Sequence, residues 1–152
     1  MIVGTVSASC STDTTGYEVD SLPPYSIYST GVKEFSGVCY NQAKTALLAV
    51  SDLGGIYEIN FDGTTRQELP YKGNNDFEAI TMNPQTGEIY LADERVNKIY
   101  KLTSANTTTL TEIVAIKISG AIANKGLEGV AYGADTLYIT NQTSPAILIK
   151  YA

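Results

Sequence analysis

The sequence contains no histidine, and this absence limits the chemistry open to the chain. Histidine is the usual general base near neutral pH and the commonest protein ligand of transition metals. Ser-His-Asp and Cys-His catalysis are therefore excluded. A catalyst built from this chain would have to depend on carboxylates, lysine, tyrosine or a hard metal ion.

Clusters of basic residues and long apolar runs are also missing. The chain has sixteen acidic and ten basic residues, a formal net charge of -6, and no run of Lys and Arg. We therefore expect no nucleic-acid partner, because neutralising phosphates requires clustered cations. No apolar run approaches the ~18 residues that cross a bilayer, so membrane contact would need a lipid anchor. The acidic balance either keeps the surface soluble or marks a cleft that attracts cations.

Two cysteines are too few for a disulfide framework or a zinc site. Cys10 follows "MIVGTVSAS" and precedes "STDTTG". Small residues before a cysteine and a polar tether after it resemble the end of a bacterial lipoprotein signal, although the apolar part is short and no basic region precedes it. We expect residues 1–16 to be a partial signal and tether, with Cys10 as the lipidation site. The alternative is an N-terminal tail that carries an incidental cysteine.

Three later segments share one pattern. They read "EFSGVCYNQAKTALLAVSD" from 34, "DFEAITMNPQTGEIYLADE" from 76 and "GLEGVAYGADTLYITNQ" from 126. The first two align without a gap, and the third has a shorter first turn. Each unit contains short strands with apolar alternation, joined by turns such as "NPQTG" and "FDGTT", which suit antiparallel hairpins.

Four short antiparallel strands in every ~40–45 residues are characteristic of a β-propeller blade. We predict an all-β propeller domain over residues 17–152, with about three four-stranded blades near 32–74, 75–124 and 125–152. A β-sandwich or barrel is the alternative, because those folds also use short strands at similar spacing. The in-register repeat favours the propeller.

Three blades do not close a ring, because propellers have typically 4–8 blades and an open arc leaves the apolar faces of its end blades bare. Either this chain is part of a longer one, or two copies pair as a homodimer that completes the propeller. The third unit stops after its third strand, at Ala152.

The segments "DFEAITMNPQTGEIYLADERVNKIYKL" and "NKGLEGVAYGADTLYITNQ" resemble the SdiA-regulated, YjiK-like family of bacterial envelope proteins. The resemblance covers about residues 32–152. It implies a six-bladed propeller, longer than this chain, that is exported to the cell envelope and often lipid-anchored. Neighbouring families are the esterase-like phytases and the regucalcin/gluconolactonase group.

The repeat places equivalent residues on one ring around the central channel. Glu78 and Glu128 share a position in the first strand, where the first unit has Ser36, and Asp93 and Asn141 share the end of the second strand. The neighbouring hydrolases bind a divalent cation in this channel through Glu, Asp and Asn. The resemblance therefore implies a metal site made of Glu78, Glu128, Asp93 and Asn141, with Ca²⁺ as the expected ion. The alternative is that these residues only cap backbone groups of the blade turns.

Two functions follow. The first is a non-enzymatic envelope propeller that binds a small molecule or an envelope protein and holds a structural divalent cation. The second is a metal-dependent esterase, lactonase or phytase-like hydrolase, in which a channel cation polarises a carbonyl and activates water without histidine.

Overall fold

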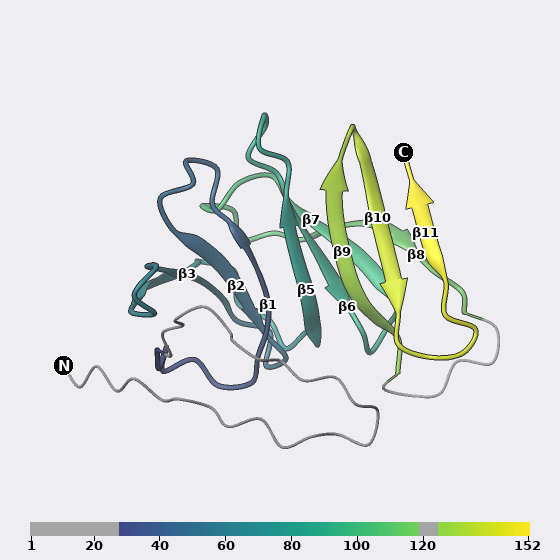
Figure 1. Ribbon diagram of the computed structural model, residues 1–152, viewed down its shortest axis with the longest axis horizontal. Helices are drawn as coiled ribbons and strands as arrows, with labels where there is room; N and C mark the ends of the chain where they lie inside the picture. The colour runs from purple at the N-terminus through teal and green to yellow at the C-terminus, as the bar shows by residue number, and fades with distance from the viewer. Residues whose placement is uncertain (1–27, 119–124) are drawn as a thin grey trace, which may run out of the picture.

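The computed structural model describes residues 28–118 and 125–152, which form three antiparallel β-sheets and contain no helix (Figure 1). Blade 1 contains β1 (Phe35–Tyr40), β2 (Leu47–Ser51), β3 (Ile56–Ile59) and β4 (Thr65–Glu68). Blade 2 contains β5 (Phe77–Met82), β6 (Ile89–Asp93), β7 (Lys98–Leu102) and β8 (Thr111–Ala115). Blade 3 contains β9 (Leu127–Gly133), β10 (Thr136–Asn141) and β11 (Leu148–Tyr151).

Each sheet is a simple meander in which consecutive strands pair. The sheets stand side by side, with β1 beside β5 and β5 beside β9, as Figure 1 shows. First strands of successive units are therefore neighbours, as the predicted propeller requires. Because none of the described residues is helical, that part of the chain has no helix able to cross a bilayer. Cys10 and the expected signal segment 1–16 lie outside the described residues.

Asparagine side chains hold the turns between first and second strands. Asn83 Oδ1 accepts hydrogen bonds from the backbone N–H groups of Gln85 at 2.9 Å and Thr86 at 3.3 Å. In the first blade, Asn41 Oδ1 accepts from residues farther along the turn, the backbone N–H groups of Thr45 at 2.9 Å and Ala46 at 3.2 Å. Gly87 has a φ of 78° in the second of these turns, a value that glycine adopts without steric cost.

Apolar side chains between the blades form the core in two clusters. We call the side of a blade that meets the next blade its forward face, and the opposite side its backward face. Leu48, Val50 and Ile56 lie on the forward face of blade 1 and pack with Phe77 and the rest of the backward face of blade 2. A second cluster joins blades 2 and 3 in the same way. Burying each large side chain contributes roughly 1.5–3 kcal/mol, so blade contacts are the main source of stability.

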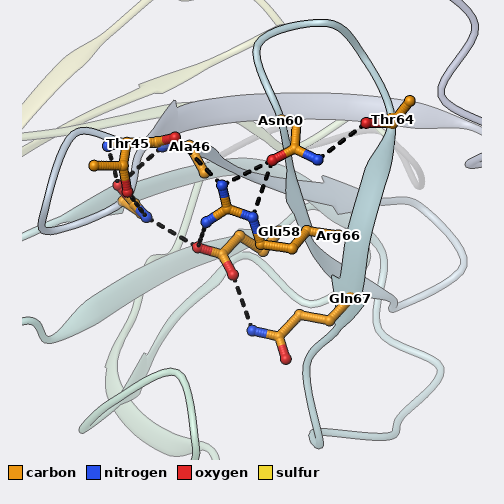
Figure 2. Close-up of polar contacts among 8 residues, drawn as sticks. Thr45, Ala46, Glu58, Asn60, Thr64, Arg66 and Gln67 are labelled. Atoms are coloured by element: carbon orange, nitrogen blue, oxygen red, sulfur yellow. Dashed lines mark hydrogen bonds and ion pairs between the residues drawn. The ribbon is translucent and has the colours of Figure 1, made fainter.

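The outer strands of blade 1 are joined by polar contacts instead (Figure 2). Glu58 on β3 accepts hydrogen bonds from Arg66 Nη1 at 3.3 Å and Gln67 Nε2 at 2.9 Å, both on β4. Arg66 Nη2 also donates to Asn60 Oδ1 at 2.7 Å. All four residues of β4 are exposed. These polar contacts therefore hold β4 against β3 but add less stability than the buried apolar faces do.

Candidate functional site

Each blade brings three equivalent positions to one edge of the arc. They are Glu34, Asp76 and Gly126 before the first strand, Ser36, Glu78 and Glu128 within it, and Asp52, Glu94 and Gln142 after the second strand. One backbone hydrogen bond repeats in every blade and fixes this arrangement. The N–H of Asp52, Glu94 or Gln142 donates to the carbonyl of the first-column residue of its own blade, at 3.1, 2.9 and 2.9 Å respectively.

Three carboxylates meet at the boundary between blades 1 and 2. Asp52 follows β2, while Asp76 precedes β5 and Glu78 lies within it. One carboxylate oxygen from each of the three lies within 4.8 Å of the other two. The Ser36 hydroxyl lies between two of them, since it donates to Asp52 Oδ1 and is also within hydrogen-bonding reach of Glu78. We call Asp52, Asp76 and Glu78 the carboxylate triad.

The boundary between blades 2 and 3 repeats part of this arrangement. Glu94 Oε1 accepts a hydrogen bond from the N–H of Gly126 at 3.1 Å, and its carboxylate lies near that of Glu128. The residue that follows one blade's second strand thus reaches the first strand of the next blade, or the residue just before it, at both boundaries.

Crowding of negative charge changes the acidity of the two glutamates. Burial, followed by the charges of Asp52, Glu128 and Glu94, raises the pKa of Glu78 to about 7, although its contact with Ser36 opposes the rise. Burial and the neighbouring Glu94 also raise the pKa of Glu128. Both effects disfavour the ionised form, as expected for carboxylates that share a site.

Little positive charge offsets this cluster. Within residues 28–118 and 125–152, the salt bridge recorded for the triad joins Arg95 Nη2 to Asp76 Oδ2 at 3.4 Å. The Arg95 side chain is 55% exposed. An exposed ion pair of this kind is screened by water and is worth at most about 1 kcal/mol.

The structure brings two of the four predicted metal ligands to this edge. Glu78 belongs to the triad, and Glu128 lies at the next boundary, close enough for its charge to act on Glu78. Asp93 instead accepts hydrogen bonds from Asn75 Nδ2 at 2.7 Å and from the Val96 N–H at 3.3 Å.

Asn141 has a similar place in blade 3. Its Oδ1 accepts from the Ile147 N–H at 2.9 Å, and its Nδ2 donates to the Thr143 carbonyl at 2.7 Å. The side chains of Asp93 and Asn141 therefore fasten the segments around the second strands, and their metal-binding role stays a prediction.

Sequence reasoning did not select Asp52 and Asp76, which complete the triad. A signal for both was present. Asp76 stands two residues before Glu78, a spacing that places two strand residues on the same face. Asp52 aligns with Glu94 at the end of the second strand, and neighbouring blades bring that end beside the next first strand.

A sequence model of the family described as SdiA-regulated matches residues 13–152. The chain belongs to the SdiA-regulated family. The match covers all three blades and confirms the family resemblance drawn from the repeated segments. A comparison of this SdiA-regulated protein with curated proteins returned no match.

Solved structures similar to this SdiA-regulated protein are propellers. One is the nidogen/laminin complex, with a TM-score of 0.54, 16% identity, and coverage of 74% of this chain and 41% of the other. Another is the WD40 repeat domain of RRP9, with a TM-score of 0.50, 9% identity, and coverage of 78% and 38%. At such identities the likeness concerns the fold alone, and it confirms the predicted propeller class. The chain spans about two fifths of the length of these structures.

Proposed function

We propose that this propeller is a ligand-binding module of the bacterial cell envelope, and that its carboxylate triad holds a Ca²⁺ ion. The observation that carries the proposal is the meeting of Asp52, Asp76 and Glu78 within 4.8 Å at a blade boundary. Their side chains come from two blades, so an ion held between them would also join the blades.

The charge of the triad supports a cation rather than an anion. Three carboxylates in this space repel one another, and Arg95 offsets only part of that repulsion. Repulsion is one cause of the raised pKa of Glu78. A bound divalent ion would reverse the effect, because a nearby positive charge favours the ionised carboxylate.

The donor set fits a hard ion. The triad and the Ser36 hydroxyl offer oxygen atoms alone, and Ca²⁺ takes ~6–8 oxygen ligands in flexible geometry. Four side chains leave positions for water or for oxygen atoms of a ligand. The ligand class that this arrangement favours is therefore an anionic or polyhydroxylated small molecule or peptide whose oxygens complete the coordination shell.

Calorimetric titration with CaCl₂ at about pH 7.5 tests the cation site, since Glu78 is then largely able to ionise. We expect saturable binding to the wild-type chain and at least a tenfold loss of affinity in Glu78→Gln. The matched control is Glu68→Gln, an exposed glutamate on β4 that pairs with Lys72 away from the triad. Equal binding by all three proteins, or no binding by any, would overturn the proposal.

The envelope location rests on the lipoprotein-like context of Cys10. Expression of the natural gene in its bacterial host, followed by membrane fractionation, tests it. We expect membrane association that is lost in Cys10→Ser. Recovery of both proteins in the soluble cytoplasmic fraction would exclude the anchor.

The second candidate is a metal-dependent hydrolase, and one observation favours it. A glutamate whose pKa is raised to about 7 is suited to general acid–base catalysis at neutral pH. Lactones, aryl esters and phytate are the substrates to test with added Ca²⁺. Turnover that is sensitive to a chelator and lost in both Glu78→Gln and Glu128→Gln would support the hydrolase, whereas a Ca²⁺-dependent rise in melting temperature without turnover supports the binding module.

A further inference from the structure

A cavity separates blades 1 and 2 at the edge of the arc where the first strands end, opposite the carboxylate triad. Its volume is about 380 Å³, within the ~300–1,000 Å³ of typical small-molecule sites. One wall comes from the β1–β2 turn and the outer strands of blade 1, and the other comes from the β5–β6 and β7–β8 turns of blade 2. Both blades are described over all four strands, so the cavity lies at a formed boundary within the arc.

The repeat explains why this space is open. At the boundary of blades 2 and 3, Tyr90 stacks on Tyr132, with ring centroids 5.8 Å apart and planes 3° apart. Their equivalents at the boundary of blades 1 and 2 are Leu48 and Met82, which occupy the same places in the aligned units and line the cavity. Neither of these side chains has a ring, and about 380 Å³ stays open there, compared with about 220 Å³ beside the tyrosine stack.

Glu58 is the polar centre of the blade 1 wall. It pairs with Leu48 across β2 and β3, which places both side chains on the forward face, and its side chain is 13% exposed. Its carboxylate accepts hydrogen bonds from Asn41 Nδ2 and Gln67 Nε2, both at 2.9 Å. The ion pair with Arg66, visible in Figure 2, offsets its charge, so the wall offers hydrogen-bonding groups with little net charge.

The turn asparagines show the same difference between the two boundaries. Asn83 Nδ2 donates a hydrogen bond to the Tyr132 hydroxyl of the next blade at 2.9 Å. The equivalent Asn41 Nδ2 donates to Glu58 Oε1, within its own blade. The tyrosine that occupies one boundary is therefore replaced at the other by a network of polar side chains along the cavity wall.

The rest of the lining combines side-chain amides with apolar groups. Gln67 donates to the wall network through Nε2, and its carbonyl oxygen can accept from a ligand. Asn106, which is exposed in the β7–β8 turn, adds an amide to the opposite wall. The apolar part of the lining includes Leu48, Leu69 and Met82. A ligand here would meet groups that both donate and accept hydrogen bonds, above an apolar base.

We propose that this cavity binds a neutral sugar, a mono- or disaccharide. Sugar hydroxyls both donate and accept hydrogen bonds, as the amides of the lining do, and the C–H groups of a sugar ring suit the apolar base. The ion pair of Glu58 with Arg66 disfavours a ligand of either charge. The site lies at the edge opposite the carboxylate triad, so it does not depend on the cation proposed there.

Two-dimensional ¹H–¹⁵N NMR of the wild-type chain tests the site, with a chelator present so that the triad holds no cation. The probes are maltose and N-acetyl-D-glucosamine, with n-butylamine as a cationic comparison. For at least one sugar we expect a dissociation constant of about 1 mM and shifts confined to the lining turns, at 41–43, 86–87 and 104–106. The proposal would be overturned by the absence of shifts at about 20 mM of either sugar, by shifts located elsewhere, or by tighter binding of n-butylamine than of both sugars.

The repeat itself supplies a variant that should close the cavity. Leu48→Tyr combined with Met82→Tyr introduces the aromatic pair of the next boundary. Asn41 could then donate to the new hydroxyl at position 82, as Asn83 donates to Tyr132. We expect the double variant to lose at least about tenfold in sugar affinity while its melting temperature does not fall. Unchanged affinity in a folded double variant would place the sugar outside the cavity.

A milder variant keeps the test valid if the double variant does not fold. Gln67→Ala removes one exposed amide of the lining and should weaken sugar binding by at least about threefold, with no change in melting temperature. The matched control is Gln85→Ala, which removes an exposed glutamine side chain of the blade 2 turn that lies outside the lining, and its affinity should equal that of the wild type. Equal affinities in all three proteins would contradict the proposed site.

Discussion

Glu78→Gln should stabilise the protein at about pH 8 in the absence of divalent cations, although it removes a polar contact near the channel. Burial and neighbouring carboxylates raise the pKa of Glu78 from 4.5 to about 7. In the unfolded chain that pKa returns to its ordinary value. Between these two pKa values the native state binds more protons than the unfolded state, so the free energy of unfolding falls as pH rises through this range.

The size of the effect follows from the same pKa values. At about 1.4 kcal/mol for each pH unit, a rise from 4.5 to about 7 corresponds to a ceiling of about 3 kcal/mol. Glu78 is partly exposed, and solvent screening reduces this figure to roughly 1–2 kcal/mol. Glutamine keeps the shape of glutamate and loses the charge, so Glu78→Gln should recover that amount above about pH 7, a rise of roughly 3–8 °C in melting temperature.

Thermal unfolding followed by circular dichroism, from about pH 5 to pH 8 with a chelator present, measures this difference. The melting temperature of the wild-type protein should fall with rising pH, and that of Glu78→Gln should fall less. Adding Ca²⁺ at about 100 times its dissociation constant should stabilise the wild type by about 2.7 kcal/mol and reverse the order of the two proteins.

The control is Glu68→Gln, which breaks an exposed 2.6 Å ion pair with Lys72. It should change stability by less than about 1 kcal/mol and leave the pH dependence unaltered. If Glu78→Gln is no more stable than the wild type at about pH 8 without cations, the carboxylates do not repel one another in the folded protein. The electrostatic account of the triad would then be wrong.

Three further predictions concern packing and accessibility. Gly37→Ala should cost about 1–3 kcal/mol in urea unfolding, because the added Cβ would lie 2.8 Å from Ala79 Cα; a loss below about 0.5 kcal/mol would show that β1 and β5 can separate. A double-mutant cycle of Tyr90→Leu and Tyr132→Leu should give a coupling of about 0.5–1.5 kcal/mol, and additive effects would mean that the stack contributes no specific energy. Burial raises the pKa of the Cys39 thiol to about 12, so in a Cys10→Ser background a thiol reagent at about pH 8 should react far more slowly in buffer than in urea, whereas equal rates would contradict the burial.

The repeat made the fold predictable. Alternating apolar residues occur in register in all three units, and a turn asparagine follows the first strand in the first two, so each unit indicates the same meander and the repetition indicates stacked meanders. The strand boundaries follow the pattern closely, since β5 covers "FEAITM" and β6 covers "IYLAD". Local turn chemistry and the pattern of buried residues favour the same structure here, which is why the fold could be predicted from this one sequence.

The site was predictable only in part, because it forms between blades. Equivalent residues in a repeat point toward similar places, and this led to Glu78 and Glu128. The triad, however, also joins carboxylates from different columns of adjacent units, as with Asp52 and Glu78. That neighbour relation depends on how far one blade is rotated from the next, which the pattern within a unit does not specify. Asp93 shows that the repeat can also mislead. It shares a column with Asn141, but its side chain accepts a hydrogen bond from Asn75 and fastens a neighbouring segment.

The two boundaries differ in a way that favours the one between blades 1 and 2 as the place of the proposed cation. At the boundary of blades 2 and 3, the first column has Gly126, whose backbone N–H donates a hydrogen bond to Glu94 Oε1 and so offsets part of its charge. At the boundary of blades 1 and 2, the first column has Asp76, which adds a third carboxylate in place of a donor.

Ser36 limits the negative charge at this boundary. If blade 1 had a glutamate at this position, as the other two blades do, a fourth negative charge would lie between Asp52 and Glu78. The serine instead supplies a neutral hydroxyl that can donate to a carboxylate or coordinate an ion through its oxygen. Ser36→Ala should therefore weaken Ca²⁺ binding less than Glu78→Gln does but should raise the pKa of Glu78 further, because it removes the one contact that favours the ionised form. A Ca²⁺ affinity that is unchanged in Ser36→Ala and also in Glu78→Gln would place the ion, if one binds, outside this boundary.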